Sequence, residues 1–313
     1  MAFPNIAFLL VDSPLSPDAL RTGAASNMDC TMMSCYYASD QPAANFYSLF
    51  SSTMPTHHGC WTPEDKPLLH APSVIPTLTK NGYEPRFAGP VNWVPLANAA
   101  GFMDTDAVES TSEVQRVVDD LGTKSNRPAV LAVVINSWTE SIVQAILEAM
   151  DKDDLKIVAV VSIGGSESYL ASPCFLISAS AKGKMKKVAP DCSIVDLTPS
   201  LLGSIGIKKK PYSFIGKDMH DAWTGREPKH GVRQAFLIEH ATGSKTLVTE
   251  GSKLTIDLDA KNCSLFDLKK DRDDANNLWN DPECEQLKQS MLLRLLWAQL
   301  DKESVPMPRV ADA

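Results

Sequence analysis

The sequence has no apolar run close to the about 18 residues that a membrane-spanning helix requires, so we expect no membrane insertion. The segment from Met1 to Val11 also lacks the basic start and the long apolar stretch of a signal peptide. Cysteine is sparse, with 7 residues that are scattered and odd in number, a pattern typical of reduced thiols rather than of a disulfide framework. These features predict a cytoplasmic, intracellular protein with no signal or transit peptide.

Basic residues are in the minority. The chain has 30 Lys and Arg against 38 Asp and Glu, which gives a formal net charge of -8. Proteins that bind nucleic acid neutralise phosphates with a basic face, so this balance argues against a nucleic-acid partner. The length of 313 residues is enough for two domains at about 150 residues each.

Apolar patterning divides the chain into two parts. Strand-like runs alternate with helical patterns over 1–228, which predicts an α/β domain with helices on its sheet. Over 229–313, short strands separated by Thr242-Gly243-Ser244 and Gly251-Ser252 indicate an antiparallel subdomain. It ends in a helix, Pro282 to Asp301, whose apolar stripe we expect in the core. The stripe consists of Leu287, Met291, Leu292, Leu295 and Leu296. The strands expected in the first part are Ile6–Val11, Ala129–Ile135, Lys156–Val161 and Cys174–Ile177, and the helices are Val74–Lys80, Ser112–Leu121, Ser141–Met150 and Leu197–Ile205.

Five segments carry motifs in a fixed order along the chain. They are Pro4–Asp12; Ser48–Ser52 with Pro55 and His58-Gly59; Thr77-Leu78 with Asn81–Tyr83 and Gly89; Asp196–Leu202 with Gly206-Ile207; and Leu265–Leu268 with Asp271, Asp274 and Asn276–Leu278. Together they resemble the sulfatase branch of the alkaline phosphatase superfamily over nearly the whole chain. The resemblance implies an α/β fold with a central mixed sheet flanked by helices, a small C-terminal antiparallel sheet and a terminal helix. A fold does not carry an activity with it, so the chemistry depends on individual positions.

The first such position is the nucleophile. Sulfatases form a hydrated-aldehyde nucleophile from the first residue of a C/S-x-P-x-R motif. Counted back from Ser51-Ser52, the nucleophile position falls on Pro42, the motif proline on Ala44 and the motif arginine on Phe46. Proline has no side-chain nucleophile to activate, and phenylalanine offers neither a charge nor the forked donors of arginine. We therefore expect no nucleophile of this type.

The resemblance also locates the groups that would bind sulfate and metal. Where the family has G-K-x-H, this chain has Gly89-Pro90-Val91-Asn92, so Pro90 and Asn92 replace the lysine and the histidine. A hard cation such as Ca²⁺ takes about 6 to 8 oxygen ligands, several of them charged. The metal positions correspond to Asp12, Ser13, Ile163 and Gly164. These residues predict neither a metal ion nor another cofactor.

The main interpretation is a catalytically inactive sulfatase-like protein that acts as a scaffold or structural subunit of a larger intracellular assembly, with other proteins as its partners. Two alternatives stay open. In the first, a metal-independent hydrolase or lyase reuses the cleft with Asp12, His57 or His58 as acid and base groups. In the second, the same cleft, uncharged and partly apolar, binds a small ligand.

Weaker candidates have simpler explanations. Cys30 and Cys35 with the adjacent histidines could bind zinc, but C-x4-C followed by vicinal histidines departs from the common ligand spacings. Glu167 is a further candidate acid or base group for the alternative enzyme. The resemblance gives His58 a structural role in the turn after its helix.

Overall fold

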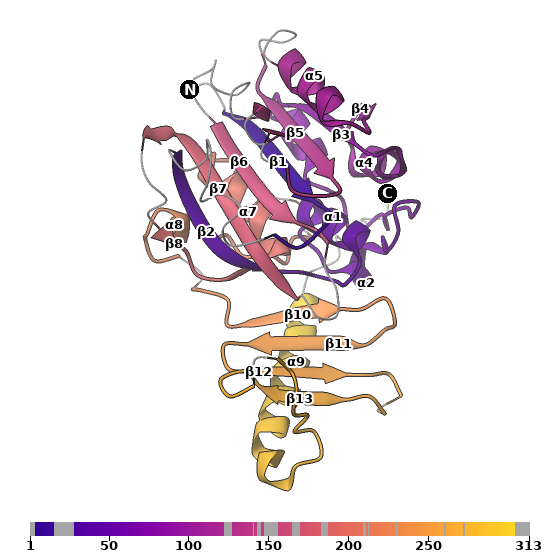
Figure 1. Cartoon of the computed structure of the whole chain (residues 1–313), viewed down its shortest axis with the longest axis vertical. Coiled ribbons are helices and arrows are strands. Elements are labelled where there is room, and N and C mark those ends of the chain that lie inside the picture. Colours follow the sequence, from indigo (N-terminus) through magenta and orange to yellow (C-terminus); the bar gives the residue numbers. More distant parts are fainter. Residues whose placement is uncertain are drawn as a thin grey trace, which may run out of the picture.

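The computed structural model of the chain describes residues 4–15, 28–121, 127–139, 141–142, 145–146, 156–164, 170–182, 187–208, 211, 213–228, 231–259, 261–271 and 273–303. These residues form a large mixed sheet with helices and a small sheet nearer the C terminus (Figure 1). The predicted α/β class is confirmed, as are the small antiparallel sheet and the terminal helix.

The central sheet has the strand order β4-β3-β5-β1-β6-β7-β2-β8, and β9 also pairs with β2. The five strands β4, β3, β5, β1 and β6 run parallel to one another, whereas β7 is antiparallel to both β6 and β2. The sheet is therefore mixed, as the resemblance implies. Its strands are β1 (Asn5–Val11), β2 (Met28–Tyr36), β3 (Glu84–Gly89), β4 (Asp104–Ala107), β5 (Ala129–Ile135), β6 (Lys156–Ser162), β7 (Ala171–Lys182), β8 (Lys187–Val188) and β9 (Cys192–Ser193).

Helices cover both faces of the central sheet. In β1, Ile6, Phe8 and Leu10 pack into a cluster with α1 (Pro42–Ser51) and α7 (Ile194–Ser204), while Ala7 and Leu9 pack into a second cluster with α5 (Thr111–Leu121). Side chains alternate between faces along a strand, so a strand that is apolar at every position must be covered on both sides. The helices of this part are α1 (Pro42–Ser51), α2 (Pro55–His58), α3 (Ile75–Lys80), η2 (Val91–Trp93), α4 (Val94–Ala100), α5 (Thr111–Leu121), α7 (Ile194–Ser204) and α8 (His220–Trp223).

The register of the parallel strands aligns their carboxyl ends. Val11, the last residue of β1, lies opposite Ile135 of β5 and Ser162 of β6. Hydrogen bonds extend the alignment by one residue, from the Asp12 N–H to the Ile135 carbonyl at 2.8 Å and from the Ile163 N–H to the Val11 carbonyl at 2.9 Å. Ligands of open α/β sheets bind outside the carboxyl ends of the strands. The predicted site positions should therefore meet at this edge.

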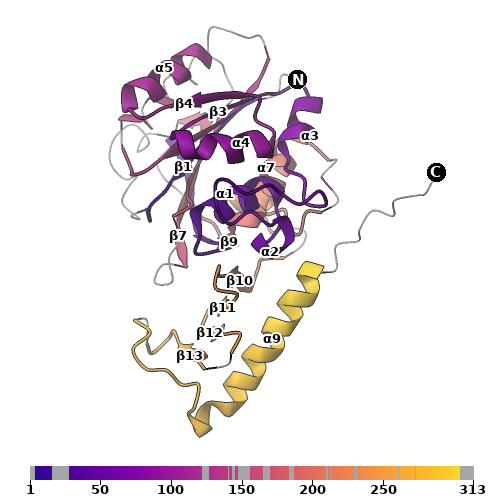
Figure 2. The same ribbon diagram turned by 90° about the vertical axis from the view of Figure 1, so that its right-hand side faces the viewer.

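The small sheet is antiparallel, in the order β10-β11-β12-β13. Helix α9 runs along one of its faces, and the C-terminal end of the helix approaches the large sheet unit (Figure 2). Met291 and Leu295 are the buried residues of α9 that pack into the core. The elements of this part are β10 (Ala235–Glu239), β11 (Lys245–Thr249), β12 (Ser252–Ile256), β13 (Ser264–Asp267), η3 (Pro282–Cys284) and α9 (Glu285–Glu303).

The prediction that the whole apolar stripe of the terminal helix lies in the core is wrong in part. Leu287, Met291 and Leu295 pack toward the core as expected, but Leu292 and Leu296 are 37% and 53% exposed. Consecutive residues of a helix are rotated by about 100° from each other, so the predicted stripe is wider than one contact face. The small sheet covers one side of α9, and part of the stripe therefore lies outside the core.

Among the described residues, no helix combines the length and apolar character needed to cross a membrane. The helix expected over Ser141–Met150 lies largely outside the described residues. The expectation of unpaired cysteines holds for those whose side chains are described. These free thiols are Cys35, Cys60, Cys174, Cys192, Cys263 and Cys284.

Candidate functional site

Asp12 and Gly164 meet at the carboxyl edge of the central sheet. A Cβ atom added at Gly164 would lie 2.6 Å from the Ser13 nitrogen and 2.7 Å from the Asp12 carbonyl carbon. The two segments are therefore in direct backbone contact, and glycine is the residue that fits at this position. Burial raises the pKa of the Asp12 carboxyl group. Within the described part of the chain, no side-chain hydrogen bond or ion pair engages this carboxyl group.

Pro42 and Phe46, which replace the nucleophile and the arginine of the resembled motif, lie on α1. Pro42 is the first residue of the helix, where its fixed φ and missing N–H are well tolerated. Phe46 is 0% exposed, and its ring contacts the rings of Phe50, Phe87 and Trp93. The Phe46 side chain is thus part of an aromatic core and is not available to a ligand.

Asn45, which the sequence analysis did not single out, holds α1 against the end of β6. Its Oδ1 accepts hydrogen bonds from the backbone N–H groups of Ala38 and Ser39 at 3.0 and 2.9 Å, and its Nδ2 donates to the carbonyls of Ser39 and Ile163, both at 2.9 Å. The side chain is fully buried, and all its donors and acceptors are used. The available signal was an amide within the apolar segment Ala43–Phe46.

Hydroxyl groups surround the same edge. The Ser162 Oγ donates to the Ser13 carbonyl at 2.7 Å, so it accepts from the Tyr37 hydroxyl, which is also 2.7 Å away. Tyr37 is buried, and burial raises the pKa of its phenol. The Ser172 Oγ accepts the N–H of Leu15 at 3.0 Å. The contacts at this edge are therefore made by neutral groups.

The divalent cation that the resemblance implies does not fit these residues. The described residues at the four metal positions include a single carboxylate, that of Asp12. The Ile163 carbonyl is occupied by Asn45, and backbone contact at Gly164 leaves no room for a ligand side chain there. In the described part of the chain, no group of three or more His, Cys, Asp or Glu could hold a metal ion. A cation that needs about six oxygen ligands lacks its ligand set here.

Pro90 and Asn92 follow β3 and line a cavity of about 530 Å³. Glu109, Asn136 and Ser137 line the same cavity. Its described lining includes amides, hydroxyls and one carboxylate, but no Lys, Arg or His. The volume suits a small ligand, whereas the cationic partners that a sulfate group requires are absent from this lining.

His58 has a structural environment. It is fully buried, and its Nδ1 accepts the backbone N–H of Cys60 at 3.0 Å, so the Nε2–H donates to the Ser48 Oγ at 2.9 Å. Burial lowers the pKa of His58 to about 3, and the ring is neutral at physiological pH. The adjacent His57 is partly exposed and meets the His70 ring at a centroid distance of 4.7 Å. Burial and then the charge of His70 lower the pKa of His57.

The acid and base groups of the alternative enzyme are not brought together by any described contact. No hydrogen bond or ion pair among the described residues joins Asp12 to His57 or His58. None of these three residues lines the cavities described around β3, around α9 and beside Tyr36. Glu167 lies outside the described residues.

Cys35 lies in a thiol cluster rather than beside the histidines. It lies opposite Cys192 in the pairing of β2 with β9, and the neighbouring thiols of Cys174 and Cys192 together with burial raise the pKa of Cys35 well above its usual value. A buried thiol of raised pKa is a poor nucleophile and a poor metal ligand. The side chain of Cys30 lies outside the described residues.

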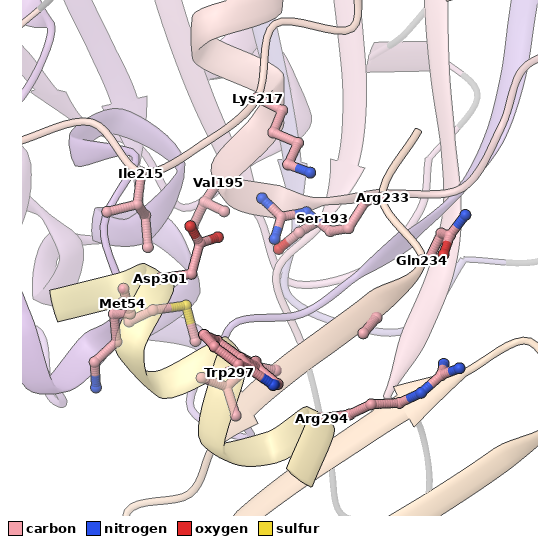
Figure 3. A pocket seen from close by; sticks show the side chains of 14 residues that line it. Met54, Ser193, Val195, Ile215, Lys217, Arg233, Gln234, Arg294, Trp297 and Asp301 are labelled. Atoms are coloured by element: carbon pink, nitrogen blue, oxygen red, sulfur yellow. The ribbon is translucent and has the colours of Figure 1, made fainter. Parts of the chain in front are cut away.

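A second cavity, here called the joint cavity, lies where α9 meets the large sheet unit. Its volume is about 480 Å³. Figure 3 shows Lys217 and Arg233 on one side and Arg294, Trp297 and Asp301 of α9 on the other. These residues are far apart in the sequence, so no local motif marks them.

Comparisons with known proteins identify the fold. No protein-family model matches the sequence, and no curated protein matches it. A solved 2-O GAG sulfatase matches with a TM-score of 0.77 and 13% identity, covering 96% of this chain and 93% of that one. The phosphonate monoester hydrolase of Agrobacterium radiobacter matches with a TM-score of 0.69 and 13% identity, covering 96% of each chain. That of Silicibacter pomeroyi matches at 0.71 and 12% identity, covering 98% of this chain and 97% of that one. The likeness concerns the fold and not the activity.

Proposed function

Starting from a chain with a sulfatase-like fold, we propose that it is catalytically inactive and acts as a structural subunit of a larger assembly. The packing of Asp12 and Gly164 supports inactivity, because two backbone segments touch where the family requires a charged site. Pro42, Phe46 and Pro90 supply neither a nucleophile nor a cation. The loss of the acidic metal ligands and the loss of the basic sulfate-binding residues are mutually consistent. Buried carboxylates repel each other without a cation, and buried cations are unstable without an anion.

Hydrolysis assays test the inactivity. We expect no turnover of aryl sulfates, phosphate monoesters or phosphonate monoesters above the uncatalysed rate, with or without Ca²⁺, Mg²⁺ or Mn²⁺. Asp12→Asn should behave like the wild type. Asp106→Asn, at an exposed carboxylate on β4, is the matched control. Turnover that requires a divalent ion, disappears in Asp12→Asn and persists in Asp106→Asn would overturn the proposal.

The structural role is supported by the outer face of α9, which consists of Leu293, Leu296, Trp297 and Leu300. These residues are 55%, 53%, 63% and 46% exposed. Their spacing of three and four residues aligns them in one stripe, on the side of the helix that does not pack on the small sheet. A contiguous exposed apolar stripe is typical of a contact surface, and it supports the structural role.

A second copy of the chain fits this surface. The apolar positions of the stripe are symmetric about the midpoint between Leu296 and Trp297. Antiparallel pairing about a two-fold axis therefore sets Leu293 of one copy against Leu300 of the other, and a two-fold contact requires such self-complementarity. Helix α9 has 19 residues, a length of about 28 Å. A single helix pair lies at the low end of interface sizes, so we expect a Kd on the order of 10 µM. Pairing is then the first step of assembly.

Light scattering after size exclusion, at protein concentrations from 1 to 200 µM, tests the pairing. The wild type should change from monomer to dimer across this range, and Leu296→Glu should stay monomeric, because burying a carboxylate in the stripe is unfavourable. Leu69→Glu is the matched control, since Leu69 is 99% exposed outside the stripe, and it should dimerise like the wild type. A wild type that is monomeric throughout, or a Leu296→Glu variant that dimerises normally, contradicts the proposal.

A further inference from the structure

The joint cavity has the size of a ligand site that the proposed function does not use. Its volume of about 480 Å³ lies within the range of about 300 to 1,000 Å³ for small-molecule sites. One wall comprises the start of α7, Lys217 and the segment before β10, and the other is the C-terminal half of α9 (Figure 3). The cavity is therefore assembled where the two sheet units meet.

Cations outnumber acids around this cavity, in a chain whose net charge is -8. Arg233 donates two hydrogen bonds to the buried Asp196 at 2.8 and 2.6 Å, which fix its guanidinium group. The Lys217 backbone N–H donates to the same carboxylate at 2.7 Å, so the residue is anchored while its ammonium group stays available. Within the described part of the chain, Lys217 and Arg294 form no ion pair. Among the described lining residues, Asp301 is the one acid.

Trp297 adds a flat apolar surface beside these cations. It is 63% exposed, although most tryptophans are largely buried. It lines the cavity from α9, and Val195 and Ile215 line the opposite wall. An exposed indole face stacks with aromatic rings. The lining thus combines a stacking surface with Lys217 and Arg294, two cations that form no ion pair within the described residues.

We propose that the joint cavity binds a small aromatic anion, a planar ring that carries a carboxylate, sulfonate or phosphate group. The ring stacks on Trp297, and the anionic group is bound by Lys217, with Arg233 beside it (Figure 3). Hydrogen bonds from charged donors to an anion are stronger than neutral ones. The anchoring of Lys217 and Arg233 also reduces the freedom lost on binding. The proposal is independent of the inactivity. Trp297 also belongs to the outer face of α9, so a variant of Lys217, which lies outside that face, separates ligand binding from pairing.

Isothermal titration calorimetry with naphthalene-2-sulfonate and 2-naphthoate tests the site, and comparison of the two identifies the preferred anionic group. At least one of them should bind with one-to-one saturation. Inorganic sulfate, which lacks the ring, and 2-naphthol, which is uncharged at pH 7.5, should each bind at least tenfold more weakly. Absence of saturable binding of both anions at 5 mM, or equal binding of 2-naphthol, would overturn the proposal.

Two variants locate the site. Lys217→Gln and Trp297→Ala should each weaken binding about tenfold, which corresponds to one lost charged contact or one lost stacking contact. The matched controls are Lys270→Gln, whose side chain is 85% exposed elsewhere, and Leu293→Ala on the outer face of the same helix. Both controls should bind like the wild type. If both Lys217→Gln and Trp297→Ala bind normally while remaining folded by circular dichroism, the anion binds elsewhere and the proposal fails. Lys217 lies off the outer face of α9, so its variant leaves pairing unchanged.

Discussion

Replacing Glu239 by glutamine is expected to lower the free energy of unfolding by about 3 to 5 kcal/mol, because it leaves a buried ammonium group without its counter-charge. The carboxylate accepts hydrogen bonds from Lys302 and Lys245, each at 2.7 Å, and from the Thr56 N–H at 2.9 Å. The side chains of Glu239 and Lys302 are 1% and 10% exposed. Burial raises the pKa of Glu239, but the charge of Lys302 and the hydrogen bonds of both lysines lower it to about 2. This network connects α2, the small sheet and α9.

Urea unfolding at pH 7.5 measures the loss. Glu285→Gln is the matched control, since it breaks a pair with Lys288 at 2.6 Å in which the Glu285 side chain is exposed, and it should leave the free energy of unfolding nearly unchanged. The double variant Glu239→Gln, Lys302→Met removes the two buried charges and should recover at least half of the loss, because the remaining cation, Lys245, is 29% exposed and can be solvated. A loss below about 1 kcal/mol in the single variant contradicts this role of Glu239.

The parallel core of the central sheet could be predicted because its strands are apolar at every position. The predicted strand Ala129–Ile135 matches β5, and Ile6–Val11 differs from β1 by one residue. Strand β2 (Met28–Tyr36) was not predicted, because its sequence mixes Asp, Thr, Ser and Cys with Met. Its stability comes from pairing with β7, which lies more than a hundred residues away in the sequence. Local pattern carries no information about such a partner.

The sequence predicts which residue types occupy the candidate site, but it does not predict how their side chains pack. Motif positions alone indicate that Phe46 carries no charge, but its aromatic contacts depend on β3 and η2. The hydrogen bond of Asn45 to Ile163 and the contact of Gly164 with the backbone of Asp12 also join segments that are far apart in the sequence, so local patterns do not predict them. The exposure of Leu296 was missed because periodicity defines an apolar face but does not show how much of it a small sheet covers.

Acid is expected to destabilise the protein from about pH 6.5 downward, because His58 must stay neutral in the folded state. Burial lowers its pKa from 6.5 to about 3. In the unfolded chain the ring regains a pKa of 6.5, so below that pH the unfolded state binds a proton that the folded state does not. The free energy of unfolding then falls by about 2.5 kcal/mol between pH 7.5 and pH 4.5 from His58 alone. Glu239, whose pKa is lowered from 4.5 to about 2, adds a loss mainly below pH 4.5.

The variant His58→Gln isolates this effect. At pH 7.5 it should cost about 2 kcal/mol, because a buried hydrogen bond and the packing of the ring are lost. Between pH 7.5 and pH 4.5, however, its free energy of unfolding should fall less than that of the wild type, because the titrating group is gone. His57→Gln, which alters a partly exposed ring in the same helix, is the matched control and should keep most of the wild-type pH dependence. Urea unfolding at unit steps of pH gives the slopes. A His58→Gln slope equal to that of the wild type would show that the buried imidazole is not the group that acid protonates on unfolding.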